Sequence, residues 1–262
     1  MTRSPTPIFY LHVRARGCTA EIRLNDAPMF AVTAEAASMA LPTVSEWVID
    51  GENTLSVDVY AIEAGAQLHV ALCQSTIGAV PEPGNELELC VIDWALGEAP
   101  LPALPFALRE AGVASHPWGV WSWQGSPEFN ADLQTTTDVI DYVRSLHAEL
   151  ARGNITALVD HSAVKFDEVA PAYELSVAEA EQRLRGAWAA LTASPGWRLA
   201  PFDERDIELR LHCEGRLVEP TTLAGEPILR QATAVDGERW SMPIFLARTN
   251  WEYTARQLTI VR

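Results

Sequence analysis

Asp160, His161 and Lys165 form the densest group of side chains that could carry acid–base chemistry in this chain of 262 residues. His161 and Lys165 stand four positions apart, which places them on one face of a helix. Asp167 and Glu168 follow closely. A general base or a metal site would need these groups to converge, and a metal needs at least three ligands, whereas His161 is the only local histidine. We therefore interpret the segment as a solvated helix face of mixed charge.

His212 lies in a run of alternating residues, on the side opposite Leu211 and Cys213, so its side chain points either to solvent or into a polar cavity. The sequence contains neither a Gly-x-Ser-x-Gly elbow nor a glycine-rich phosphate loop. We assign no catalytic residue, no cofactor and no metal.

Tryptophans are concentrated in one short segment. Three of the nine in the chain, Trp118, Trp121 and Trp123, follow His116 within a few residues. In an extended segment Trp121 and Trp123 would share one face. Such a cluster predicts an aromatic platform that stacks on a sugar ring or anchors a partner. The alternative is a seam that packs two domains together, so these four residues are binding candidates only.

The first part of the chain alternates between apolar and polar residues in short runs separated by turn residues. This pattern predicts an all-β sandwich or jelly roll. The expected strands are Ile8–Arg16, Thr19–Leu24, Phe30–Thr33, Ser38–Leu41, Thr54–Ala61, Gln67–Gln74 and Leu87–Trp94.

Three prolines in residues 99–105 interrupt any regular element, because each removes a backbone donor and fixes φ. They predict that the first domain ends nearby. We expect a β-sandwich domain at 1–112, a Trp-rich linker at 113–131 and an α+β domain at 132–262.

The pattern changes to a helical period after Asp132. A first amphipathic helix carries Val139 to Leu150, a second covers Ile155–Asp167, and a third begins at Ser176 with a capping box to Glu179. Strands are expected to follow, at Asp206–Cys213, Pro227–Ala234, Trp240–Ala247 and Glu252–Val261. Helices followed by an antiparallel meander predict an α+β domain.

The corner that precedes the fifth expected strand supports a resemblance. An asparagine at the end of an alternating strand, the segment Ser45–Ile49 and the run Asp50–Val57 resemble the galactose-binding-like β-sandwich family over about forty residues. The resemblance implies a module that binds glycans or proteins through its loops. In this corner Gly51 can adopt a positive φ and Asn53 can cap backbone groups.

The element order of residues 132–262 is similar to the cone-shaped fold of the nuclear-transport-factor-two-like family. That family includes isomerases and dehydratases together with binding and dimerising domains, and its catalytic members project an Asp or a His into the cone. The resemblance thus implies that Asp160, His161, Tyr173 or His212 would line a cone, and it suggests a homodimer.

Composition narrows the class of protein. The net charge is −16, from 19 basic and 35 acidic residues, and no Lys/Arg run occurs, so we expect no nucleic-acid partner. No apolar stretch approaches the roughly 20 residues of a membrane helix, and the start of the chain lacks a signal sequence. We expect no membrane association and a cytoplasmic location. The four scattered cysteines predict buried, reduced thiols.

These observations favour a non-enzymatic cytoplasmic binding or adaptor protein with a protein partner. One version is a bacterial immunity or secretion-accessory protein, because an acidic protein can neutralise a basic toxin. Two alternatives stay open: a carbohydrate-binding protein that uses the tryptophan platform, and a small-molecule enzyme of the isomerase or dehydratase type in the C-terminal cone.

Overall fold

The computed structural model describes residues 6–79, 86–97, 103–130, 132–234, 239–249 and 257–262. Contacts between Cα atoms divide the chain into two compact units, residues 1–120 and 121–262. The sequence places boundaries at 112 and 132, whereas the contacts place one division after Val120. Each unit is described by itself below.

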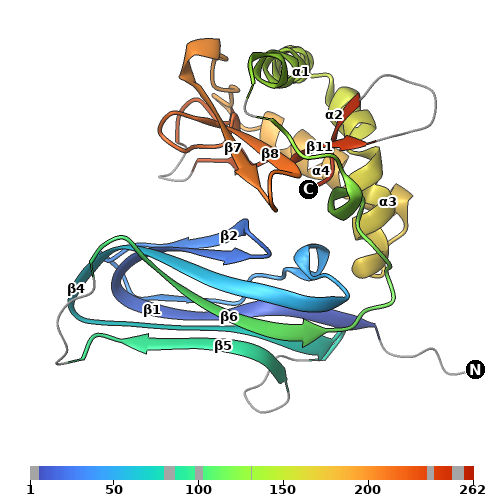
Figure 1. Cartoon of the computed structure of the whole chain (residues 1–262). Helices are drawn as coiled ribbons and strands as arrows, with labels where there is room; N and C mark the ends of the chain where they lie inside the picture. The colour runs from blue at the N-terminus through green and yellow to red at the C-terminus, as the bar shows by residue number, and fades with distance from the viewer. Residues whose placement is uncertain (1–5, 80–85, 98–102, 131, 235–238, 250–256) are drawn as a thin grey trace, which may run out of the picture. The chain divides into compact units, whose positions relative to one another are not determined.

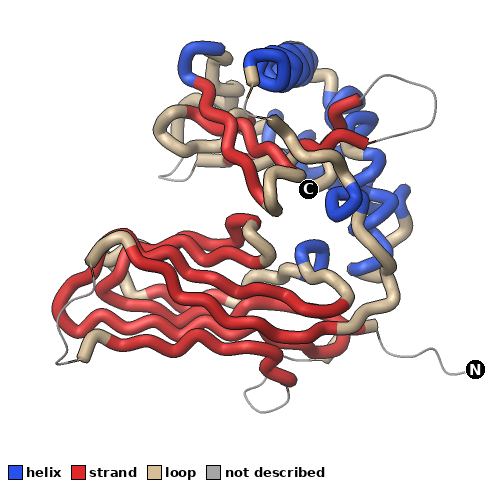
Figure 2. The backbone as a smooth tube through the Cα atoms, in the orientation of Figure 1, coloured by secondary structure: helices blue, strands red, loops and turns tan. Residues whose placement is uncertain are grey.

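The described residues of the first unit form an antiparallel sheet (Figures 1 and 2). Its six strands are β1 (Pro7–Leu24), β2 (Ala27–Val32), β3 (Ser38–Ala40), β4 (Gly51–Thr76), β5 (Leu87–Ala95) and β6 (Phe106–Ala114). β1 and β4 pair along their length, β2 and β3 pair with β1, and β5 and β6 pair with β4. A short 3-10 turn, η1 (Ser45–Trp47), lies between β3 and β4.

The two longest strands, β1 and β4, each contain two strands that were expected to be separate. β1 contains the first two expected strands, Ile8–Arg16 and Thr19–Leu24. Gly17, at φ +60°, sits where the pairing register with β4 shifts, between Arg16 and Cys18. β4 likewise continues through Gly65, at φ +73°. Glycine tolerates these backbone angles inside a strand, so a residue that reads as a turn produces a bulge instead.

Strand β6 follows the prolines of residues 99–105, and the sequence pattern did not predict it. β6 begins directly after Pro105 and pairs with β4 from Gly51 to Val59. A proline that precedes a strand removes no ladder hydrogen bond, which explains why the element survives. β6 also lies against β5, because a Cβ atom at Gly112 would come within 2.7 Å of the Leu89 carbonyl oxygen.

The core of the first unit consists of alternating residues of β1 and β4. Side chains on one face are buried, among them Phe9, Leu11, Val13, Ile22, Leu55, Val57, Leu68 and Val70. The residues between them in β1 and β4 point to the opposite face of the sheet. The expected buried thiols are confirmed, since all four cysteines are buried and free.

The second unit begins with helices. They are α1 (Leu133–Ala151), α2 (Ile155–His161), α3 (Ala163–Ala172) and α4 (Val177–Thr192), preceded by the 3-10 turn η2 (Ser122–Gly125). The predicted capping box of α4 is confirmed, with Ser176 and Glu179 bonded reciprocally. The single helix expected at 155–167 is wrong, because Ser162 leaves helical geometry and separates α2 from α3.

The C-terminal strands form a four-stranded antiparallel sheet with the order β12-β11-β8-β7. The strands of the second unit are β7 (Ile207–His212), β8 (Leu217–Thr222), β9 (Leu229–Arg230), β10 (Ser241–Met242), β11 (Leu246–Thr249) and β12 (Gln257–Ile260), and the 3-10 turn η3 (Glu204–Asp206) precedes β7. The sequence missed β8, because all six of its residues are buried and no alternation marks it. The strand expected at Pro227–Ala234 shrinks to β9, and residues 252–256 lie outside the described residues.

One hydrophobic cluster joins the helices to this sheet. It includes Val139, Val143 and Leu146 from α1, Leu158 from α2, Trp188 from α4, and Val218, Leu246 and Ile260 from the strands. None of the described helices is both long and apolar enough to cross a membrane.

Candidate functional site

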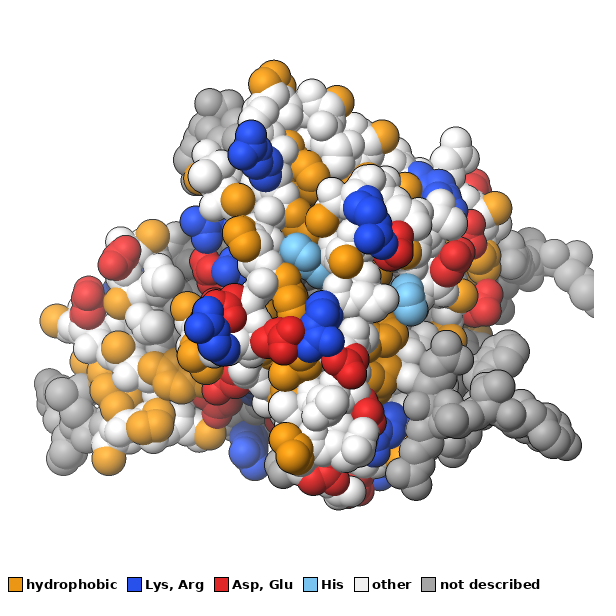
Figure 3. Space-filling model, turned by 90° about the horizontal axis from the view of Figure 1, so that it is seen from above, with side chains coloured by type: hydrophobic (Ala, Val, Ile, Leu, Met, Phe, Trp, Pro, Cys, Tyr) orange, Lys and Arg blue, Asp and Glu red, His pale blue; other side chains and the backbone are white. Residues whose placement is uncertain are grey.

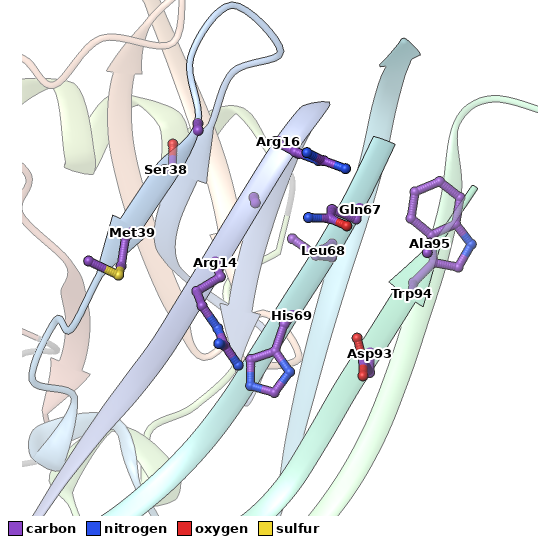
Figure 4. Close-up of a pocket in the computed structure, with 12 residues that line it drawn as sticks. Arg14, Arg16, Ser38, Met39, Gln67, Leu68, His69, Asp93, Trp94 and Ala95 are labelled. Carbon is purple, nitrogen blue, oxygen red and sulfur yellow. The ribbon is translucent and has the colours of Figure 1, made fainter. Parts of the chain in front are cut away.

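A groove of about 440 Å³ lies on the first unit, over strands β3, β1, β4 and β5 (Figure 4). We call it the sheet groove. Its polar and aromatic lining includes Arg14, Arg16, Gln67, His69, Asp93 and Trp94. The volume falls in the range of about 300–1,000 Å³ that is typical of small-molecule sites.

Strand register brings the lining residues together. Arg14 of β1 pairs with Met39 of β3 on one side and with His69 of β4 on the other, and His69 pairs with Asp93 of β5. Directly paired residues project from the same face of a sheet. Figure 4 shows the Arg14 guanidinium beside the His69 ring. One row of side chains therefore crosses the groove from Met39 to Asp93.

A second row lies two residues further along each strand. Arg16 pairs with Gln67, and Gln67 pairs with Ala95. Side chains at i and i+2 of a strand share a face, so Arg16 stands beside Arg14 at a backbone separation of about 7 Å. The two rows create a surface in which two guanidinium groups, an amide and an imidazole adjoin each other.

Arg14 and Arg16 are exposed. Within the part of the chain that the structure describes, neither guanidinium has a hydrogen bond or an ion pair. Other arginines do, since Arg144 pairs with Asp141 and Glu204, and Arg230 pairs with Glu226. Figure 3 shows such mixing of basic and acidic side chains on the face that it presents. The sheet groove thus holds positive charge that no described carboxylate pairs with, in a protein of net charge −16.

His69 contributes a neutral imidazole at the middle of the groove. Burial lowers the pKa of His69 below 6.5, Arg14 lowers it further, and Asp93 partly offsets both effects. Its Nε2 atom is buried and has no hydrogen-bond partner among the described residues. The His12 ring meets the His69 ring edge-on, with centroids 5.6 Å apart. His69 therefore has a free hydrogen-bonding position at neutral pH.

No sequence pattern singled out these residues. Residues 12, 14 and 16 occupy alternate positions of the expected strand Ile8–Arg16, so their common face could be read from the sequence. What could not be read is the pairing of that face with Gln67, His69 and Asp93, because it depends on the register of strands distant in the chain.

The predicted tryptophan platform is distributed over both units. Trp118 belongs to the first unit, where its ring stacks on His116 at 4.6 Å and meets Phe9 edge-on at 6.0 Å. His116 is itself buried, with Nε2 3.0 Å from the Val48 carbonyl oxygen. Burial lowers the pKa of His116, and the Val48 contact partly offsets that shift.

Trp121 and Trp123 belong to the second unit and are 1 % and 4 % exposed. Trp121 and Trp123 do not lie in one extended segment, because residues 122–125 form η2. The Arg262 guanidinium lies 4.8 Å from the centre of the Trp121 ring, and its Nη1 donates to Glu168 Oε2 at 2.8 Å. Both rings therefore lie in the interior.

The cavity candidates lie in separate surroundings. His161 ends α2 and meets the Tyr142 ring edge-on at 4.9 Å, and burial lowers its pKa. Tyr173 lies at the C-terminal end of α3. His212 is buried on β7, with Nε2 3.0 Å from Glu219 Oε2. The contacts described for these three candidates share no residue.

Among the described residues, no group of three or more His, Cys, Asp or Glu side chains is arranged to hold a metal ion. Comparison of the chain with family models, with curated proteins and with solved structures gave no match. The candidate site therefore depends on the geometry of the sheet groove alone.

Proposed function

We propose that this protein is a non-enzymatic binding protein and that the sheet groove is its recognition site. The observation that carries the proposal is the pair Arg14 and Arg16, which project into the groove without a described partner of opposite charge. A guanidinium is always charged and presents a planar set of hydrogen-bond donors. Two neighbouring guanidinium groups without a described carboxylate partner therefore favour binding of an external anionic group.

The backbone under the groove supports this function. Its polar residues stand on paired strands rather than on loops, and β1 and β4 are held by an almost continuous ladder. Side chains on regular strands are positioned before the ligand arrives, which reduces the entropy lost on binding.

The charge of the groove bears on the kind of partner. A net charge of −16 favours a basic protein partner, as in the proposed immunity or secretion-accessory role. The sheet groove is locally opposite in sign, because Arg14 and Arg16 have no ion-pair partner there among the described residues. We therefore propose that the groove takes a ligand with a negative group and that a basic partner would dock elsewhere.

The finer fold assignments belong to the same proposal. The β1–β4 ladder is long and is divided in two by the register shift between Arg16 and Cys18. This division supports a galactose-binding-like β-sandwich for the first unit. Four helices followed by an antiparallel sheet support a nuclear-transport-factor-two-like cone for the second.

Ligand capture with the full chain tests the function without assuming what the ligand is. The immobilised protein is exposed to an extract of the source cells, and bound proteins and small molecules are identified by mass spectrometry. The groove variant R14E/R16E is compared with R183E/R198E, which makes the same change of charge at exposed arginines of the second unit.

We expect the wild type and the control variant to retain the same ligand and the groove variant to lose it. Equal recovery by all three proteins, or no retained ligand, would contradict a recognition role for the groove. Thermal unfolding of each variant shows whether the folded protein was tested.

A further inference from the structure

We infer that the sheet groove binds a polyhydroxylated small molecule with a single oxyanion group, that is, a sugar acid. This inference rests on the proposed binding function and names the class of its ligand. It depends on the two chemically different ends of the groove, cationic over β1 and polar-acidic over β5.

The β1 end fits an oxyanion. Arg14 and Arg16 stand two residues apart on one face, so both guanidinium groups can reach one carboxylate or phosphate placed between them. Figure 4 shows the Arg16 side chain extending toward Gln67 and the Arg14 side chain toward His69. The anion would thus lie beside an amide and an imidazole that can accept hydrogen bonds from neighbouring hydroxyl groups.

The β5 end excludes a second anion. Asp93 stands across His69 from Arg14 and has no described ion-pair partner. A negative group near Asp93 would be repelled, whereas a hydroxyl group can donate to its carboxylate. A polyanion such as a nucleic-acid strand is therefore disfavoured, and a ligand with one charged end and one hydroxylated end is favoured.

The size and remaining lining agree with a sugar. The distance from β1 to β5 is two strand spacings, about 10 Å, which matches one or two pyranose rings. Gln67, which pairs with Arg16 and so lies on the same face, adds a hydrogen-bonding amide.

Calorimetric titration of the full chain at low ionic strength tests the inference. The probes are D-galacturonate and D-glucuronate, the neutral sugars D-galactose and D-glucose, and inorganic phosphate. We expect at least one uronate to bind about tenfold or more tightly than its neutral counterpart and than phosphate, and we expect salt to weaken its binding. The variant R14Q/R16Q should lose uronate binding.

Two further variants separate the ends of the groove. Asp93→Ala should reduce uronate affinity to the level of inorganic phosphate, whereas R183Q/R198Q should leave it unchanged. Equal binding of uronates and neutral sugars, or preference for phosphate, would overturn the inference. If no probe binds while R14E/R16E still loses the captured cellular ligand, the sugar-acid inference fails and the proposed binding function stands.

Discussion

The side-chain amides of Asn25 and Asn53 are hydrogen-bonded to each other, with 2.8 Å between Asn25 Nδ2 and Asn53 Oδ1. Asn53 is fully buried, accepts a second bond from the Ile49 N–H and donates to the Ile49 and Gly51 carbonyl groups. Asn25 Oδ1 accepts from the Thr54 N–H. The pair thus joins the β1–β2 turn to the start of β4.

Replacement of Asn53 by alanine should lower the free energy of unfolding by about 2–4 kcal/mol, because the Ile49 N–H and the Asn25 amide would lose a buried acceptor. Urea denaturation of the intact chain measures the change. Thr54→Ala, whose side chain is exposed, serves as the control and should stay within about 0.5 kcal/mol of wild type. Equal stability of the Asn53 variant and the control would contradict the structural role of the amide.

This corner shows what the sequence could predict. Gly51 and Asn53 were expected to form a turn that caps backbone groups, and both the positive φ of Gly51 and the capping bonds of Asn53 are present. Local bonds from a side chain to the backbone depend on residues near each other in the chain, so the local sequence indicates them. Helix α4 was predicted for the same reason, through its capping box.

Long-range pairing accounts for what the sequence could not give. β8 carries no alternation because it is buried on both faces, and β6 follows prolines that read as an end. The sheet groove needs His69 and Asp93 to stand beside Arg14, which is decided by the register of three strands. A shift of one residue would turn any of these side chains to the other face.

Gly112→Ala should destabilise the first unit by about 2 kcal/mol or more. An added Cβ would lie 2.7 Å from the Leu89 carbonyl oxygen, so β6 and β5 would have to separate. Gly97→Ala is the matched control, since nothing lies within 4 Å of its added Cβ and its φ is not in the positive range. Thermal unfolding compares the two variants. A Gly112 variant as stable as the Gly97 variant would disprove the close approach of β5 and β6.

Titration of His69 tests the electrostatics of the sheet groove. Its pKa lies below 6.5, first because of burial and then because of Arg14, while Asp93 raises it. Arg14→Gln should therefore raise the pKa of His69 toward its ordinary value, and Asp93→Asn should lower it further. NMR titration of the imidazole resonances measures both. Shifts in the same direction for the two variants would contradict the arrangement in which the charges flank His69.

Stability should fall with acidification in a defined range. Burial lowers the pKa of His147 below 6.5, with the Ala200 carbonyl partly offsetting it, so the unfolded chain takes up a proton more readily than the folded one. Above about pH 7.5 His147 is neutral in both the folded and the unfolded chain, so it adds no pH dependence there. The folded state loses stability as the pH falls through 6.5 toward the lowered pKa. His147→Gln should flatten this slope in urea denaturation. An unchanged slope would show that other groups determine it.

Glu168 and Arg262 offer a test of the interior of the second unit. The Arg262 side chain is 1 % exposed, and Glu168 accepts from it and from the Ser122 N–H, at 2.8 and 2.6 Å. Glu168→Ala should cost about 3–5 kcal/mol, because it leaves a guanidinium buried against Trp121 without its carboxylate.

A double-mutant cycle separates this loss from the effect of truncation. Arg262→Met removes the charge but keeps an apolar chain over Trp121, so Glu168→Ala should cost much less in that background than in the wild type. Urea denaturation followed by tryptophan fluorescence measures all four proteins. If the two substitutions add within about 0.5 kcal/mol, the ion pair does not couple α3 to the C-terminal residue, and the burial of Trp121 must depend on packing alone.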